Sequence, residues 1–282
     1  MLHKLFRRLP NFRGKSRFSR LLLGKYIHLA KDILVKGRFN CEYLLPNITE
    51  SISFEIFING IYESETFDFL ISAIPQGGCF LDLGANIGSI TIPLKKQRQD
   101  IQCICVEASP WIVEYLKKNV LLNFVEGSIQ ILNRALFDKG GEILPFYSPT
   151  DKFGKGSFSP AFTKEVVEVT TITIDQLAKD YGLPQVDMIK IDIEGYEYFA
   201  FKGAATLLYS EQAPDIFFEF VDWAEELAGL NKGAAQQVLI EAGYNLYRFT
   251  ENGKLSPSLE VITRGSEMLF ASKKSNYRQQ QF

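Results

Sequence analysis

Two stretches of the chain place residues suited to ligand binding or proton transfer where apolar runs end. In the first, Cys79–Leu83 is a short apolar run of the kind that a buried parallel strand requires. The turn after it, residues 84–88, reads G-A-N-I-G, and an apolar helical pattern starts directly afterwards. This order predicts a nucleotide cradle, because glycines expose bare backbone and a helix start offers free N–H groups. The predicted cradle residues are Asp82, Gly84, Ala85, Asn86 and Gly88.

The spacing of the glycines bears on which nucleotide this cradle binds. Gly84 and Gly88 are spaced G-x-x-x-G, so the dinucleotide fingerprint G-x-G-x-x-G is absent. S-adenosylmethionine (SAM) fits better, because Asp82 can hold its cationic amino group and SAM has no pyrophosphate for a carboxylate to repel. The string D-x-G-A-N-x-G closely resembles motif I of class I SAM-dependent methyltransferases, in the form used by the FkbM family. An ordinary strand–turn–helix without a ligand is the alternative.

A second carboxylate is placed to bind a ribose. Glu107 ends the next apolar run, about 25 residues after Asp82. In a doubly wound sheet it would lie beside the first turn and accept bonds from both ribose hydroxyls, each worth roughly 1.5–3 kcal/mol. NAD sites use the same device, so Glu107 indicates a ribose without choosing the cofactor. The string E-A-S-P resembles the FkbM pattern, which implies that Ala108 and Ser109 also lie at the cofactor; Ser109 is in addition a good N-cap.

Three further residues complete the predicted cofactor site. A third strand over Ser128–Leu136 would bring Ala135 and Leu136 to the adenine. Glu63, in a spacing of Gly60, Tyr62 and Glu63 that resembles FkbM proteins, is predicted to reach the amino end of the cofactor. A helix-start glutamate stabilised by the helix dipole is an equal alternative for this residue.

The second informative stretch, Val186–Glu197, reads V-D-M-I-K-I-D-I-E-G-Y-E. Lys190, Asp192 and Glu194 alternate through a predicted buried strand, and buried charges are expensive unless they meet partners or a ligand. In a 3-2-1-4-5 sheet this strand would be the fourth, at the edge where open α/β sheets bind ligands. I-K-x-D-x-E-G-x-E is the most specific FkbM signature in the chain. A structural Lys–Asp ion pair that only braces the sheet is the alternative.

The acidic residues of this stretch are the candidates for catalysis. Methyl transfer from a sulfonium is an in-line displacement, in which positioning can supply roughly 7–11 kcal/mol. A hydroxyl acceptor also needs to lose a proton, and both histidines, His3 and His28, lie in the N-terminal segment. The candidate bases in the core are Asp192, Glu194, Glu219 and, as a lysine of lowered pKa, Lys190.

Among these candidates Asp192 is the favoured base, with Lys190 holding it in place and Glu194 orienting cofactor or acceptor. Positioning alone, with water taking the proton, is the alternative. A divalent ion on Asp192 and neighbouring acids is a further alternative, but no ligand spacing in the sequence calls for one, and no metal ligands are predicted.

The elements that position these residues predict an α/β protein. The expected fold is the class I methyltransferase, Rossmann-like doubly wound sheet, mostly parallel with an antiparallel last strand, with a small N-terminal helical/β appendage. Before the sheet, the alternation of Ile52, Phe54, Ile56 and Ile58 predicts a strand. The predicted divisions are a basic arm (1–40), an appendage packed on the core (41–75), the methyltransferase domain (76–273) and a disordered tail (274–282).

A long loop joins the predicted strands Glu142–Tyr147 and Val166–Ile174 and is rich in Gly, Ser, Pro and Phe. It has the composition of a lid or a substrate-binding segment. Its Gly156-Ser157 pair matches a position where the FkbM family commonly has G-S, which implies that Ser157 contacts the acceptor. Glu219, near the end of the predicted fifth strand, is expected to face the same crevice. A mobile insertion without ligand contacts is the alternative for the loop.

Composition limits the class of protein. The 282 residues are 46% hydrophobic with a net charge of −2, which favours one globular α/β domain and gives no overall attraction to nucleic acid. The four cysteines lack the spacing of a disulfide framework or a zinc site. Cys79, Cys103 and Cys105 lie inside apolar runs, so we expect them to be reduced core residues of a cytosolic protein. No apolar run reaches transmembrane length and no signal peptide is recognisable, so a cytoplasmic location is expected.

Residues 1–38 differ from the rest, with eleven Lys and Arg against one acid, Asp32, among Leu and Phe residues. The favoured interpretation is a solvated helix packed on the catalytic domain, or a partly mobile arm. Contact with anionic lipid at the inner face of a membrane is the alternative. Nucleic acid is not an expected partner.

The FkbM resemblance covers roughly Gly60 to Phe220 and implies O-methylation, often of a sugar hydroxyl in a glycan, glycolipid or secondary metabolite, with S-adenosylhomocysteine (SAH) as product. The expected partner is therefore a saccharide or small-molecule acceptor, and the motifs do not identify it. A non-catalytic SAM-binding scaffold of a glycan assembly is one alternative. An NAD-dependent oxidoreductase is another, disfavoured by the missing fingerprint and by Asp82. The sequence predicts no oligomeric state.

Overall fold

An eight-stranded sheet in the order β12-β11-β13-β10-β9-β3-β4-β5 forms the centre of the computed structural model, which describes residues 6–8, 14–250, 254–274 and 277. Its strands are β3 (Cys79–Leu83), β4 (Gln102–Glu107), β5 (Ile129–Asn133), β9 (Met188–Ile191), β10 (Asp215–Val221), β11 (Asn245–Phe249), β12 (Leu255–Pro257) and β13 (Ser266–Ser272). The strands from β5 to β10 are parallel, and β13 lies antiparallel between β10 and β11. The predicted doubly wound α/β class and its 3-2-1-4-5 order are therefore confirmed.

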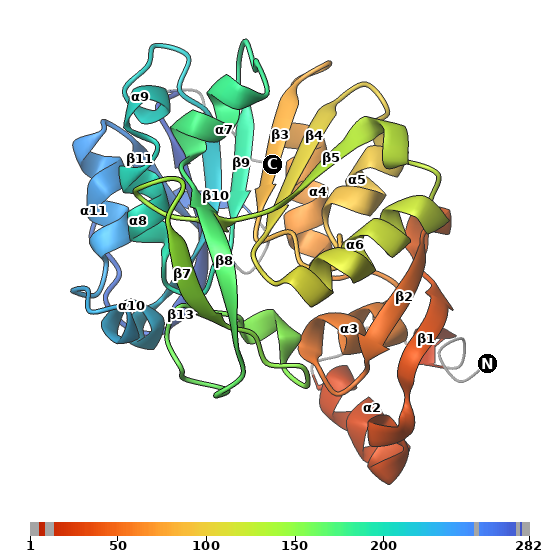
Figure 1. The fold of residues 1–282 in the computed structure, drawn as a ribbon. Helices are drawn as coiled ribbons and strands as arrows, with labels where there is room; N and C mark the ends of the chain where they lie inside the picture. Colours follow the sequence, from red (N-terminus) through yellow and green to blue (C-terminus); the bar gives the residue numbers. More distant parts are fainter. Residues whose placement is uncertain (1–5, 9–13, 251–253, 275–276, 278–282) are drawn as a thin grey trace.

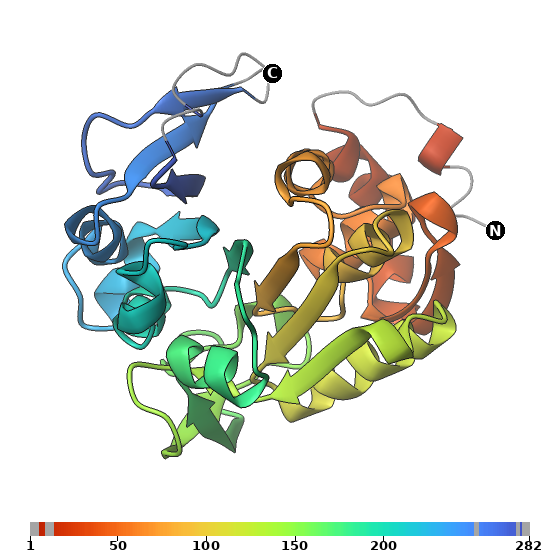
Figure 2. The same ribbon diagram turned by 90° about the horizontal axis from the view of Figure 1, so that it is seen from above.

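Helices cover both faces of this sheet (Figures 1 and 2). On one face lie α4 (Ser64–Ala73), α5 (Thr91–Gln97) and α6 (Pro110–Leu122); on the other lie α7 (Ile174–Asp180), α8 (Glu197–Lys202), α9 (Ala205–Leu208), α10 (Asp222–Leu227) and α11 (Ala234–Glu241). Alternate strand residues serve the two layers, so that Phe80 belongs to one core cluster and Leu81 to the other. Cys79, Cys103 and Cys105 are buried and free, as expected, and so is Cys41.

A small second sheet carries the predicted lid. It consists of β6 (Ala135–Leu136), β7 (Ile143–Tyr147) and β8 (Val166–Ile172), and the loop between β7 and β8 contains the short helix η4 (Phe153–Lys155). The predicted third strand is thus divided, because β5 stays in the large sheet while β6 leaves it to pair with β8. The short helix η3 (Glu126–Ser128) precedes β5.

The N-terminal part packs beside α6. Its elements are α2 (Lys15–Leu23), η1 (Gly24–Leu29), β1 (Lys31–Lys36), η2 (Arg38–Asn40), β2 (Glu42–Asn47) and α3 (Ser51–Asn59). The β1–β2 hairpin is held to α6 by two asparagines: Asn119 Oδ1 accepts from the Leu44 N–H at 2.7 Å, and Asn123 Oδ1 accepts from the Glu42 N–H at 2.9 Å. Among the described residues, no helix is both long and apolar enough to cross a membrane.

The predicted strand over residues 52–58 is wrong, because this segment is the helix α3. Glu50 caps its start by accepting from the Ile52 N–H at 2.6 Å, and Gly60 ends it in a left-handed conformation. The helix is buried on nearly every side, so its apolar residues do not follow a one-sided period of 3.6. Of the predicted tail, Lys274 and Tyr277 both bind Asp215 Oδ2, at 2.8 and 3.0 Å, and the rest lies outside the described residues.

Candidate functional site

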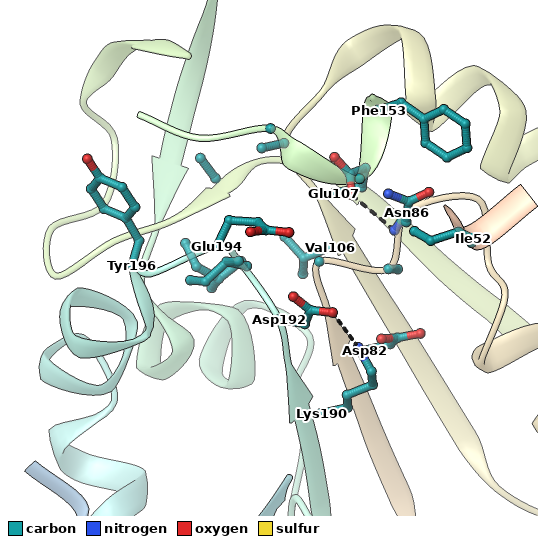
Figure 3. A pocket seen from close by; sticks show the side chains of 18 of the residues that line it. Ile52, Asp82, Asn86, Val106, Glu107, Phe153, Lys190, Asp192, Glu194 and Tyr196 are labelled. Atoms are coloured by element: carbon teal, nitrogen blue, oxygen red, sulfur yellow. Dashed lines mark hydrogen bonds and ion pairs between the residues drawn. The ribbon is translucent and has the colours of Figure 1, made fainter. Parts of the chain in front are cut away.

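A pocket opens at the carboxyl ends of β3, β4 and β9, the edge predicted from the sheet order (Figure 3). Its empty volume of ≈ 780 Å³, open solvent included, falls within the range of roughly 300–1,000 Å³ that is typical of small-molecule sites. Eleven of the sixteen predicted site residues line it: Asp82, Gly84, Ala85, Asn86, Glu107, Ala108, Ala135, Leu136, Lys190, Asp192 and Glu194.

The turn after β3 approaches the loop after β9 so closely that only glycine fits. A Cβ built on Gly84 would lie 2.0 Å from the Asp192 carbonyl oxygen, and the residue has a φ of +82°. Gly88 does not line the pocket; its Cβ would meet Ile92 and Leu116 at 2.6 and 2.9 Å, so this glycine allows α5 and α6 to pack. Asn86 also has a positive φ, and its Oδ1 accepts from the Ile87 N–H at 2.9 Å.

Asp82 presents an unpaired oxygen to the pocket. Its side chain is 1% exposed, Oδ2 accepts from the Thr91 hydroxyl, and Oδ1 has no hydrogen-bond partner. Burial raises the pKa of Asp82, while the nearby Lys190 charge opposes that rise. A buried carboxylate oxygen without a partner is costly unless a ligand completes it, and a cationic amino group would do so.

Glu107 is held rigidly at the end of β4. Its two oxygens accept from the Asn86 N–H at 3.0 Å and from the Ser109 N–H at 2.8 Å. Burial raises its pKa to about 7, and these backbone donors limit the rise. Ser109 itself does not line the pocket: its hydroxyl bonds to Ser148 at 2.6 Å and makes no capping bond to α6. Its backbone, rather than its side chain, therefore supports the site.

Aromatic residues of β7 and of the loop after it line one side of the pocket, and none of them was among the predicted site residues. Phe146, Phe153 and Phe158 line the pocket beside the predicted Ala135 and Leu136. Tyr62, Arg134 and Tyr196 line it as well. The Phe-rich composition of the loop was the available signal, and the lid interpretation agrees with this position, while contact with an acceptor stays a prediction. Ser157 is not in the lining; its backbone pairs with that of Tyr147 at 2.8 and 3.0 Å.

Two lysines form ion pairs with carboxylates that line the pocket. Lys190 Nζ lies 3.4 Å from Asp192 Oδ2, and Lys155 Nζ lies 2.6 Å from Glu194 Oε1. Since β9 ends at Ile191, Asp192 and Glu194 lie on the loop after the strand, not on its face as predicted.

Lys190 is fully paired with negative charge. Burial lowers the pKa of Lys190, but the charges of Asp192, Asp82 and Glu63 together raise it by more than burial lowers it. The net pKa is therefore above the ordinary value of a lysine. The raised pKa disfavours the alternative in which Lys190 acts as a base of lowered pKa. Its predicted contact with Asp192 is confirmed by the ion pair.

Glu219 comes from β10 and joins Asp192 and Glu194. One carboxylate oxygen from each of the three residues lies within 4.8 Å of the others. Burial, followed by the charges of Asp192 and Glu194, raises the pKa of Glu219 to about 9. Burial and Asp192 raise that of Glu194 to about 7, against the effect of Lys155. Glu219 does not itself line the pocket but lies beside two carboxylates that do, and its predicted contact with the acceptor stays a prediction.

Glu63 lies apart from the predicted cofactor residues. It lines a neighbouring cleft with Glu55, Thr66 and Phe217, and it does not line the pocket of Figure 3. Burial raises its pKa, and its Oε2 has no hydrogen-bond partner. Its side chain makes no capping bond to α4. Its predicted contact with the cofactor stays a prediction.

The pocket fits SAM on observations of this structure. The unpaired Asp82 Oδ1 can take an amino group, Glu107 lies where a ribose would bind, and the Gly84 turn leaves the backbone bare. Ala108, Ala135, Leu136 and Phe146 offer an apolar slot for a base.

Comparisons with known proteins agree with this assignment. The family described as "Methyltransferase FkbM domain" matches residues 82–253. The curated methyltransferase sdnD of Sordaria araneosa is 24% identical over 178 residues, which are 53% of this chain and 66% of that protein, so the chain spans just under two thirds of this relative.

Solved structures of low similarity were also found. One is a precorrin-6y C5,15-methyltransferase from Geobacter metallireducens (TM-score 0.44, 14% identity, covering 76% of this chain and 90% of that one). Another is a SAM-dependent O-methyltransferase from Thermotoga maritima (TM-score 0.40, 11% identity, covering 86% and 78%).

Proposed function

Because the chain belongs to the FkbM methyltransferase domain family, and SAM is the cofactor that this family implies, we propose that it methylates a hydroxyl oxygen, in a sugar of a glycan, glycolipid or secondary metabolite. The observation that carries the proposal is the Lys190–Asp192 pair at the base of the pocket. Of the described residues lining the pocket, none is a histidine, so carboxylates are the groups that can take a hydroxyl proton there.

Each side chain has a separable part in this proposal. SAM, when bound, supplies the electrophilic methyl group. Asp82 and Glu107 hold the amino and ribose ends of SAM, and Gly84 allows the loop after β9 to lie close to the cofactor. Lys190 holds Asp192 in place through their ion pair, and Asp192 accepts the proton of the acceptor hydroxyl. The aromatic lid residues exclude water, which strengthens the interactions among these charges.

The test is methyl transfer from labelled SAM to a panel of lipid-linked and nucleotide-linked sugars. Asp192→Asn is expected to lower turnover by about 10²–10⁴-fold, the usual worth of a general base, while SAH binding persists. Unchanged turnover in this variant would remove Asp192 as the base. SAH binding by the wild type with no turnover on any acceptor would favour the non-catalytic scaffold instead.

A second proposal concerns the outer side of α2 and η1. We propose that this face contacts anionic lipid. Four of its apolar side chains are 59–79% exposed: Leu21, Leu22, Tyr26 and Leu29. Arg17 precedes these residues in the chain and Lys25 lies among them, both exposed, a combination that fits an anionic membrane surface. We call these six residues the α2–η1 surface.

The inner side of the same segment supports the packing interpretation. Arg20 donates to the Thr49 carbonyl at 3.0 Å and lies 4.1 Å from the centre of the Phe54 ring. Leu23 and Ile27 are buried. Packing thus accounts for the inner side, while the α2–η1 surface is left to water (Figure 1).

A further inference from the structure

Three carboxylates from two parts of the chain converge at the pocket, and two of them, Asp192 and Glu194, line it. Asp192 and Glu194 follow β9, while Glu219 lies in the neighbouring strand β10. One oxygen from each lies within 4.8 Å of the others. Oxygen ligands about 2.1–2.5 Å from a Mg²⁺, Mn²⁺ or Ca²⁺ ion lie roughly 3–5 Å from one another, so the spacing suits a shared ion.

A second observation points to a missing cation. The Glu194 side chain is 8% exposed, its Oε1 is bound by Lys155 at 2.6 Å, and its Oε2 is buried without any hydrogen-bond partner. Figure 3 shows the Glu194 and Asp192 carboxylates in the same part of the pocket. A buried, unpaired carboxylate oxygen is strongly disfavoured unless a proton or a cation completes it.

The chemistry of the cluster selects a class of ion. All three ligands are carboxylate oxygens, with no sulfur or imidazole, which suits hard divalent ions better than zinc or copper. When ionised, as they would be around a bound cation, the three carboxylates carry three negative charges against two lysines, Lys155 and Lys190, and Lys190 also lies near Asp82 and Glu63. The cluster therefore has more negative charge than its lysines neutralise.

We propose that Asp192, Glu194 and Glu219 bind a divalent cation of the Mg²⁺/Mn²⁺ class at the base of the pocket. A divalent ion on Asp192 and neighbouring acids was open from the sequence, but residue spacing could not identify the ligand set, because Glu219 comes from another strand. The role of the ion rests on the proposed function: it would hold the acceptor's oxygen and make its proton easier to remove. The site itself does not depend on turnover.

Manganese binding tests the site without any acceptor. Mn²⁺ is titrated into the full chain and the free ion is followed by electron paramagnetic resonance, for the wild type, Glu219→Gln and the matched control Glu65→Gln. Glu65 is an exposed glutamate at the start of α4. We expect wild-type binding below about 1 mM, weakened by about 10–100-fold in Glu219→Gln and unchanged in the control.

No wild-type binding at about 1 mM, or equal binding in Glu219→Gln, would overturn the proposal. A second variant guards against misfolding of the first. Lys155→Met removes the lysine that occupies Glu194 Oε1, so Mn²⁺ should bind several-fold more tightly; weaker binding would contradict the proposal. SAH titration of the same samples reports the cofactor site separately, so loss of the metal site and failure of the methyltransferase assignment give different results.

Discussion

The pocket and the α2–η1 surface differ in which side chains are exposed to solvent: the pocket has buried charged groups, and the α2–η1 surface has exposed apolar ones. In the pocket, Asp82, Glu107 and Lys190 are at most 8% exposed, and fixed partners orient them. On the α2–η1 surface the cations are exposed, and Leu21 and Leu29 are 79% and 74% exposed. One region thus holds charges where water is scarce, and the other holds apolar side chains where water is plentiful.

Both arrangements cost free energy in the isolated chain, and each cost is relieved by a different kind of partner. Burial raises the pKa of Glu107 and of Glu219, which means that the free protein disfavours their ionised forms. A small ligand with hydroxyl and cationic groups would favour those forms. The α2–η1 surface instead needs an extended apolar boundary with negative charge. The comparison therefore separates a small-molecule site from a surface for docking.

The largest expected effect comes from adding a side chain at Gly84, where the turn after β3 touches the loop that contains Asp192. Gly84→Ala puts a Cβ 2.0 Å from the Asp192 carbonyl oxygen at a φ of +82°, so the loops must separate. We expect the free energy of unfolding to fall by about 3 kcal/mol and SAH affinity to fall by more than ~100-fold.

Gly77→Ala is the matched control for this change. Gly77 also has a positive φ, +69°, but nothing lies within 4 Å of its added Cβ. It should lose only about 1–2 kcal/mol of stability and keep its SAH affinity. Equal loss of affinity in both variants would show that the Gly84 contact does not define the pocket. Thermal unfolding and calorimetry measure the two effects.

The next effect is a pH dependence of cofactor binding. The pKa of Glu107 in the free protein is about 7, raised by burial from 4.5. Because the ionised form accepts the ribose hydroxyls, SAH affinity should be roughly tenfold lower at pH 6 than at pH 8. The effect of Glu107 on folding stability has the opposite pH dependence. Because its pKa is higher in the folded protein than in the unfolded chain, this carboxyl contributes its full stabilisation below pH 4.5, and that stabilisation is lost as the pH rises through about 7.

Glu107→Gln identifies the titrating group. This variant should bind SAH weakly, with nearly the same affinity at pH 6 and pH 8. A tenfold pH dependence that persists in Glu107→Gln would assign the titration to another residue. Calorimetric titration at the two pH values makes the measurement.

The smallest effect concerns the α2–η1 surface. Leu21→Glu removes an exposed apolar side chain and adds a negative charge, so binding to anionic liposomes should fall by about tenfold. Leu259→Glu is the control, because Leu259 is 94% exposed on another part of the chain. Flotation at low and high salt measures binding; equal flotation of both variants, or wild-type binding that ignores salt, would leave packing as the only role of the segment.

The elements that local patterns specify could be predicted from the sequence. The apolar run of β3, the glycine turn and Glu107 at the end of β4 are each determined by a few neighbouring residues, and short right-handed crossovers then give the strand order. The site residues predicted on this basis, such as Asp82 and Ala135, line the pocket.

What the sequence did not predict depends on tertiary contacts. The α3 segment was assigned to a strand because a helix buried on all sides lacks a polar face. The approach of Glu219 to Glu194 depends on how β10 lies beside β9. Ser109 was expected to lie at the cofactor, but it does not line the pocket, and its hydroxyl bonds to Ser148 on the loop after β7.

The central claim is that the pocket of Figure 3 binds SAM, and one calorimetric experiment tests it directly. SAH, SAM and NAD are titrated into the purified wild type and into Glu107→Ala. We expect micromolar binding of SAH and SAM, no binding of NAD, and loss of binding in Glu107→Ala. Binding of NAD, or binding of none of the three, would contradict the account.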